Sequence, residues 1–434
     1  MVISLLLAVL AAASGPATSA EAATRAAVAR VHAVDPQIHA VIALDPTALD
    51  QARAIDRGRR ARGLLYGYAI LLKDNIEAEG PLPTTAGSMA LLDNVTHRDA
   101  PLVARLRGAD AVILGKTNLS EWANIRSNAS ISGWSAVGGQ TRNPHALDRN
   151  PCGSSSGSAA AVAAGEVQAA IGTETDGSIT CPAAVNGVVG LKPTVGLVSR
   201  SRIVPISHSQ DTAGPIAADV ATAARVLGAI AGTDPADFAT RDADAHVTDY
   251  LAALKPDALK GARIGVLRFA TGWSAGTDKL FEQALAVLKA QGATLVDITA
   301  LKDREKIGEA EELVLHTELK VDLNAYLATT PPTVKTRTLA DVIAFDAANG
   351  DQSNGAGAGS LAAVAGYPHL TVPMGAVMGL PVGLSIIGPA WSEARLLGYG
   401  YAYEQAAKAQ VTPRFLPSIE AAAPVAPLLE PLQR

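Results

Sequence analysis

Two glycine- and serine-rich segments, residues 151–158 (PCGSSSGS) and 172–179 (GTETDGSI), constrain the fold of this chain more than any other feature. The first opens a segment typical of a helix over 159–164, and an apolar strand over 167–171 leads into the second. A glycine-rich turn before a helix directs several backbone N–H groups toward one point, where they can hold an anion or the oxyanion of an acyl-transfer intermediate. Either segment on its own could equally be a structural turn or a phosphate-binding loop.

Short apolar strands alternate with helical segments along most of the chain. We expect helices over residues 25–34, 46–61, 101–107, 159–164, 219–230, 278–291, 305–327 and 392–410. We expect strands over residues 64–72, 111–114, 167–171, 263–267, 294–296, 370–372 and 382–387. This alternation predicts an α/β fold in which helices cover a central sheet. The 434 residues, 48% of them hydrophobic, allow one large domain or two ordinary ones.

Charge and motif patterns argue against several function classes. The net charge of −5 shows no basic excess, which does not suit a nucleic-acid partner. Residues 110–117 nearly match a P-loop, but Asp110 replaces its first glycine and would repel phosphate. The eight histidines are scattered, and neither a metal-binding spacing nor the G-x-S-x-G motif of many serine hydrolases is present. We therefore expect no nucleic-acid partner, no metal and no cofactor.

The chain has two cysteines, Cys152 and Cys181. Two cysteines are too few for a disulfide framework, so the fold must be stabilised by its hydrophobic core. We interpret them as small buried thiols.

The N-terminus has the pattern of a signal peptide. Residues 2–13 form an apolar run that is too short to span a bilayer, and Ser14, Gly15 and Pro16 break it before the small residues Thr18, Ser19 and Ala20. The positive charge that usually begins such a peptide is missing, so a buried N-terminal helix or a mis-set start codon remains an alternative. We expect residues 1–20 to be a signal peptide, the protein to be secreted or periplasmic, and the mature chain to have no membrane span.

Taken together, the two glycine- and serine-rich segments are similar to the signature block of the amidase signature family. The family motifs GGSSGGS and GTDTGGSI correspond to residues 152–158 and 172–179, and Ser154 and Ser178 are 24 positions apart (178 − 154), as is usual in that family. Further matches are LLKDN at 71–75, GKTN at 115–118, GLKPT at 190–194, DTAGP at 211–215 and AGYP at 365–368. The ETDGS variant, preceded by GQTRNP at 139–144, is most similar to bacterial peptide amidases, which remove C-terminal amides from peptides.

The resemblance implies a fold, a reaction and a set of residues. The fold would be a mixed β-sheet core covered by helices, in a single domain over 21–434 with its signature core at about 64–230. Ser178 would be the nucleophile, Ser154 on a cis peptide the proton relay, and Lys73 the base. Lysine can serve as a base only when neutral, so burial must lower its pKa by several units.

The resemblance also implies supporting roles around these three residues. The backbone N–H groups of Thr175, Asp176, Gly177 and Ser178 would hold the oxyanion. Ser155 would be a supporting hydrogen-bond donor. Asp211 is expected to be a structural acceptor rather than a catalytic acid.

The chain departs from the family near residues 349–360, where members have several tens of additional residues that include a strand. A strand and a wall of the substrate pocket are therefore expected to be missing. The predicted substrate is a small amide or an amidated peptide, and the sequence does not indicate an oligomeric state. The alternatives are a component of a glutamine-dependent amidotransferase, a deletion-bearing homologue without catalysis, and an esterase.

Overall fold

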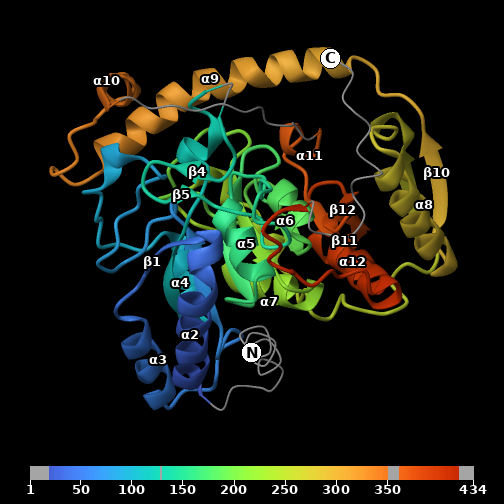
Figure 1. Ribbon diagram of the computed structural model, residues 1–434, viewed down its shortest axis with the longest axis horizontal. Helices are drawn as coiled ribbons and strands as arrows, with labels where there is room; N and C mark the ends of the chain where they lie inside the picture. The colour runs from blue at the N-terminus through green and yellow to red at the C-terminus, as the bar shows by residue number, and fades with distance from the viewer. Residues whose placement is uncertain (1–18, 128–129, 350–360, 420–434) are drawn as a thin grey trace.

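An eight-stranded sheet forms the centre of the computed structural model, which describes residues 19–127, 130–349 and 361–419 (Figure 1). Its strands lie in the order β1-β3-β2-β6-β8-β7-β11-β12. Their bounds are β1 Val41–Leu44, β2 Ala69–Lys73, β3 Val112–Thr117, β6 Ala169–Glu174, β7 Val189–Lys192, β8 Thr212–Ala217, β11 His369–Val377 and β12 Leu380–Ile387. Strand β2 runs parallel to β3 and β6, and the remaining pairs are antiparallel. The predicted mixed sheet is therefore confirmed.

Helices cover both faces of this sheet because its inner strands are apolar on both sides. Ile70 and Leu72 point into one core, with α4, α7, α8 and α12. Leu71 points into the other core, with α2, α3, α5 and α6. The bounds are α2 Ala20–Ile38, α3 Ala48–Arg57, α4 Pro101–Gly108, α5 Ser156–Ala163, α6 Thr180–Asn186, α7 Val220–Ile230, α8 Ala275–Ala290 and α12 Glu393–Ala407. This two-sided burial is typical of α/β domains.

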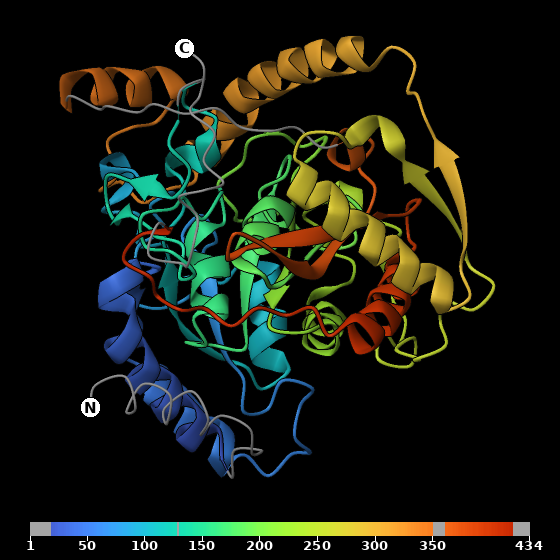
Figure 2. The ribbon, with the colours of Figure 1, turned by 45° about the vertical axis from the view of Figure 1, so that its right-hand side comes forward.

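Two longer excursions leave this central unit (Figures 1 and 2). One consists of α9, Arg304–Ala328, and α10, Leu339–Asn349, whose inner sides pack on Trp122 and Val204 in a separate small core. The other contains α8 and a parallel pair of strands, β9 Arg263–Leu267 and β10 Thr294–Ile298. A short hairpin of β4 Trp134–Ser135 and β5 Gly139–Gln140, and the one-turn helix α11 Leu361–Val364, also belong to the described chain. Within the described residues, no helix is both long and apolar enough to cross a membrane.

The element boundaries differ from the sequence-based expectations in several places. The strand expected over 64–72 begins at Ala69, because a turn that includes Gly67 at a φ of 84° precedes it. The second helix runs over Ala48–Arg57 and is shorter than expected. The expected signal peptide and the expected deletion fall mainly on residues 1–18 and 350–360, which lie outside the described residues.

Candidate active site

The predicted site residues come together where the parallel strands β2 and β6 end. Lys73 is the last residue of β2, and its side chain follows Leu71 on the face covered by α5 and α6. Ser154 lies in the loop before α5, and Ser178 lies in the turn between β6 and α6. The carboxyl ends of parallel strands are the usual place for the functional loops of an α/β sheet.

The Lys73 side chain is fully buried and has three hydrogen-bond partners. Its Nζ lies 2.7 Å from Ser154 Oγ, 2.8 Å from Thr173 Oγ1 and 3.1 Å from Thr173 O. Burial lowers the pKa of Lys73 from 10.5 to about 7, while the negative charges of Asp211 and Glu174 oppose this shift. A neutral amine has two hydrogens and one lone pair. It can donate both hydrogens to Thr173 and accept the Ser154 hydroxyl hydrogen.

The two serines are held by their backbones. The peptide bond between Gly153 and Ser154 is cis, as the resemblance implies. The N–H of Ser155 donates to Ser178 O over 3.1 Å, and Ser155 Oγ donates to Thr173 O over 3.0 Å. Ser154 is fully buried and Ser178 is 7% exposed. Within the described part of the chain, no hydrogen bond joins the hydroxyls of Ser154 and Ser178.

The turn before Ser178 is shaped by a buried carboxylate. Thr175 Oγ1 donates to Asp211 Oδ1 over 2.5 Å, and Asp211 Oδ2 accepts the N–H groups of Ile206 and Ser207. Gly177 has a φ of 75°, which favours glycine at this position. No acceptor among the described residues takes the backbone N–H of Gly177 or Ser178. These two N–H groups are therefore available to a ligand, while Asp176 is half-buried at the edge of the turn.

Cys152 and Cys181 form a disulfide, so the interpretation as buried free thiols is wrong. Their Cα atoms lie 6.0 Å apart, and 29 positions separate them in the sequence. Both are half-buried. The bond forms because the loop before Ser154 folds against the helix after Ser178, an arrangement that cysteine spacing does not reveal.

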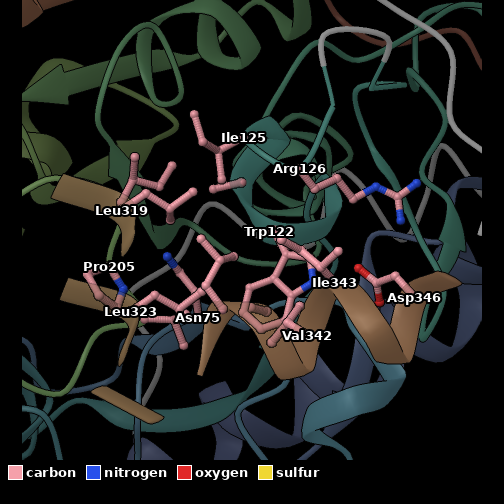
Figure 3. A pocket seen from close by; sticks show the side chains of 15 residues that line it. Asn75, Trp122, Ile125, Arg126, Pro205, Leu319, Leu323, Val342, Ile343 and Asp346 are labelled. Atoms are coloured by element: carbon pink, nitrogen blue, oxygen red, sulfur yellow. The ribbon is translucent and has the colours of Figure 1, made fainter. Parts of the chain in front are cut away.

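A cavity with two lobes lies beside Lys73 and the β6–α6 turn. The smaller lobe, of about 220 Å³, is mostly apolar, with Trp122, Leu319, Leu323 and Ile343 among its walls (Figure 3). The larger lobe, of about 770 Å³, reaches Thr173, Thr175 and Asp211. Both lobes share a boundary of five residues: Asn75, Ala123, Val204, Pro205 and Ile206.

The Ser154 hydroxyl lies behind the cavity wall, where Lys73 connects it to Thr173. Asn75 Nδ2 donates to Thr173 Oγ1 over 3.0 Å, and the same oxygen accepts from Lys73. The boundary between the lobes is therefore two hydrogen bonds from the lysine. Thr173 and Thr175 line the larger lobe, whereas Ser154 and Ser178 line neither lobe.

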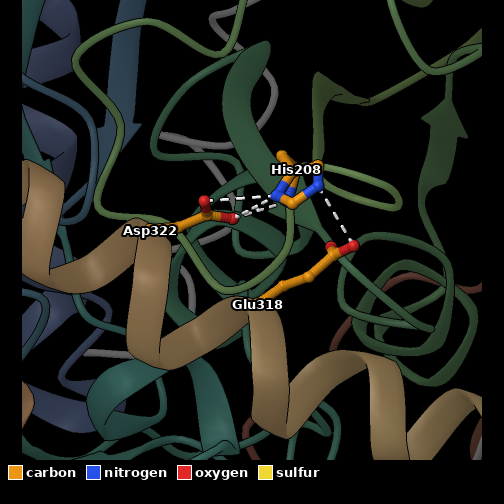
Figure 4. Close-up of side chains that lie close together, drawn as sticks. All are labelled: His208, Glu318 and Asp322. Atoms are coloured by element: carbon orange, nitrogen blue, oxygen red, sulfur yellow. Dashed lines mark hydrogen bonds and ion pairs between the residues drawn. The ribbon is translucent and has the colours of Figure 1, made fainter.

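Three further side chains cluster at the rim of the larger lobe (Figure 4). His208 Nδ1 lies 3.0 Å from Asp322 Oδ2, and His208 Nε2 lies 3.2 Å from Glu318 Oε1. These donor atoms are close enough together to be considered as a cation site, but each ring nitrogen already faces a carboxylate. The cluster fastens the 207–209 loop to α9, since Glu318 also accepts from Ser207 and Ser209.

Thr173 and Glu174 had no predicted role in the sequence, although both lie in the GTETDGSI segment. Thr173 contacts Lys73 twice, and Glu174 Oε2 accepts the N–H groups of Ile179 and Thr180 over 2.7 and 2.9 Å. The available signal was a carboxylate beside a glycine-rich turn, where nearby side chains can bind backbone N–H groups that lack other partners.

Comparison with known proteins gives consistent similarities. A family model described as Amidase matches residues 22–349. A probable amidase of Arabidopsis thaliana is 38% identical over 449 residues, which cover 88% of this chain and 86% of that protein. The crystal structure of native peptide amidase from Stenotrophomonas maltophilia is similar with a TM-score of 0.85 and 46% identity, covering 92% of this chain and 95% of that one. One component of the glutamyl-tRNA(Gln) amidotransferase of Moorella thermoacetica is 36% identical over 463 residues, 89% of this chain and 93% of that protein.

Proposed function

We propose a specific reaction for this chain, which belongs to the amidase signature family and is a hydrolytic amidase. In this proposal it hydrolyses the C-terminal amides of peptides through an acyl-enzyme on Ser178. The observation that carries this proposal is the buried Lys73, hydrogen-bonded to Ser154 beside the turn that carries Ser178. Its pKa of about 7 leaves a large neutral fraction at neutral pH. The similarity to the Stenotrophomonas peptide amidase supports the substrate class.

The proposed reaction moves one proton along three side chains. Ser178 Oγ attacks the amide carbon and passes its proton to Ser154 Oγ, whose own proton passes to Lys73 Nζ. The carbonyl oxygen becomes negative and is stabilised by the N–H groups of the 175–178 turn. Ser154 then returns a proton to the departing ammonia, and a water molecule cleaves the acyl-enzyme by the same route. The two serine hydroxyls must come into contact for the first transfer.

The lobed cavity suggests how a peptide amide is held. The small lobe has Trp122, Leu319, Leu323 and Ile343 among its walls, and it would take an apolar side chain of the peptide. The larger, more polar lobe leads past Thr173 and Thr175 and would take the peptide backbone.

Ammonia release from a peptide amide tests this function. The wild-type protein should release ammonia from amidated peptides and not from the same peptides with free carboxyl ends. Ser178→Ala should lower this rate by at least about 10³-fold, as loss of a nucleophile does in other serine hydrolases. A fluorophosphonate should label the wild type at Ser178, whereas a homologue without catalysis would not react.

The amidotransferase alternative rests on the similarity to the glutamyl-tRNA(Gln) amidotransferase component from Moorella thermoacetica. A protein of that kind would use glutamine as its amide and would work together with partner proteins. Release of ammonia from glutamine but not from peptide amides, with co-purification of such partners, would favour this alternative.

We also propose that the protein is exported and that its mature chain begins at Glu21. An oxidising compartment would allow the Cys152–Cys181 disulfide to form. Glu21 N already donates to Asp56 Oδ2 over 2.9 Å, so a new terminal ammonium would lie against a carboxylate. N-terminal sequencing of protein from the periplasm or the medium should begin at Glu21, and a chain that still begins at Met1 would contradict the proposal.

A further inference from the structure

Glu174 is a buried carboxylate that has no role in the reaction proposed above. It is the last residue of β6 and is 1% exposed. Its Oε2 accepts the N–H of Ile179 over 2.7 Å, the N–H of Thr180 over 2.9 Å and Thr180 Oγ1 over 3.2 Å. These donors begin α6 immediately after Ser178, so one carboxylate oxygen closes the turn that carries the nucleophile.

The neighbouring residue makes the corresponding contacts with the base. Thr173 accepts from Lys73 Nζ with both its carbonyl and its hydroxyl oxygen. The last two residues of β6 therefore hold the two ends of the predicted triad. They are adjacent in a rigid strand, so displacement of one displaces the other.

Several buried titratable groups lie near Glu174. Glu174 Oε1 has no hydrogen-bond partner in the described part of the chain, and the same is true of both ring nitrogens of His369. Glu174, Lys192 and His369 lie at the ends of β6, β7 and β11, on the α6 side of the sheet. Burial lowers the pKa of His369 to about 4, so this ring is neutral at neutral pH.

The charges around Glu174 include both buried lysines. Its negative charge opposes the burial that lowers the pKa of Lys73 to about 7 and that of Lys192 to about 8. The other titratable groups that act on this region are Asp211 at Lys73, and Asp176 and Glu393 at Lys192. Two buried amines and three donated hydrogen bonds therefore lie around this carboxylate.

We propose that Glu174 is a positioning residue that serves both ends of the triad: its Oε2 fixes the turn that carries Ser178, and its charge stabilises the ammonium of Lys73 that forms during acylation. This inference rests on the proposed acyl-enzyme mechanism. In that step the Ser178 Oγ–carbon bond forms, the carbonyl electron pair moves to oxygen, and one proton reaches Lys73 through Ser154. A positive charge thus appears in a buried site, where a nearby fixed anion stabilises it strongly.

Two variants separate the two parts of this role. Glu174→Gln keeps an oxygen that can accept from Ile179 and Thr180 but removes the charge. Glu174→Asp keeps the charge but shortens the side chain, so it cannot reach both N–H groups in the same way. Glu166→Gln is the matched control, because Glu166 is also a fully buried glutamate but is not among the groups that shift the pKa of Lys73.

The measurement is kcat and kcat/KM against pH, with far-UV circular dichroism to establish folding. Loss of the anion disfavours the ammonium, so the acid limb of kcat/KM in Glu174→Gln should move to lower pH by about 0.5–1 unit. Its kcat at the plateau should fall about tenfold, the rate equivalent of one pKa unit of lost stabilisation. Glu174→Asp should lower kcat without moving the limb, and Glu166→Gln should change neither.

An unmoved limb in folded Glu174→Gln overturns the charge role, and an equal shift in Glu166→Gln shows that the effect is not specific to Glu174. If Glu174→Gln does not fold, Glu174→Asp carries the test, and a wild-type kcat in that variant overturns the positioning role. The rate of fluorophosphonate labelling of Ser178 gives the same profile without any choice of substrate. A wild type that is labelled but releases no ammonia from peptide amides would refute the proposed substrate and leave the Glu174 test intact.

Discussion

The Cys152–Cys181 disulfide should make a measurable contribution to stability. It closes a loop across 29 positions, and the chain-entropy relation for a loop of that length gives about 3.6 kcal/mol at 25 °C. Unfolding a chain of 434 residues carries an entropy of about 0.9 kcal/mol per degree. Removal of the cross-link should therefore lower Tm by about 4 °C.

Differential scanning calorimetry of four samples measures this change. The wild type and the double variant Cys152→Ala/Cys181→Ala are each scanned with and without dithiothreitol, and mass spectrometry establishes that the wild-type bond is reduced. The oxidised wild type should unfold about 4 °C above the other three, which should agree with one another. A fully reduced wild type with an unchanged Tm would refute the reasoning, because the cross-link would then not restrict the unfolded chain.

Four further changes test other parts of the structure. The pKa of about 7 for Lys73 means that kcat/KM should fall as pH drops below about 7, since only the neutral amine accepts a proton. Lys73→Met should abolish turnover at every pH. An acid limb near pH 4 in the wild type would contradict this role. Thr173→Val removes one of the hydrogen bonds to Lys73 and should lower kcat about tenfold with little change in KM, which steady-state kinetics would show. Leu323→Ala enlarges the small lobe and should lower kcat/KM for amides of leucine and phenylalanine more than for glycinamide, and equal losses would place the side chain elsewhere. The pKa of His369 is about 4 in the folded protein and near 6.5 in the unfolded chain, so the unfolded chain binds the proton first. The free energy of unfolding should therefore decrease as pH falls from about 6.5 to 4. His369→Leu should flatten this pH dependence in urea titrations.

The fold was predictable from the sequence where single strands are apolar and long enough to be distinctive. The strand predicted over 263–267 coincides with β9, Arg263–Leu267, because its apolar residues stand between polar segments. Strands β7 and β8 were not predicted, since glycine and proline at Gly190, Gly214 and Pro215 remove the usual β-strand signal. These strands exist because neighbouring strands supply their hydrogen bonds, which is a tertiary effect.

The site likewise has parts that the sequence predicted and parts that depend on tertiary contacts. Ordered motifs predicted the family, which comparison with known proteins confirms, and motif positions placed Lys73, Ser154 and Ser178 in one site. The disulfide and the contacts of Glu174 depend on which loops meet in space. The spacing of cysteines and carboxylates along the chain does not predict which loops lie in contact, so these features follow only from the structure.

The cavity walls have a consequence for how this protein can change. The predicted triad comes from the first 180 residues and lies at the central sheet, whereas Leu319, Leu323 and Ile343 come from α9 and α10, which pack in a separate small core with Trp122 and Val204. Substitutions in these two helices can therefore reshape the small lobe without moving Lys73, Ser154 or Ser178. A library restricted to α9 and α10 should yield variants with new substrate preferences and unaltered reactivity toward fluorophosphonates, so that chemistry and selectivity would evolve as separate modules of one chain.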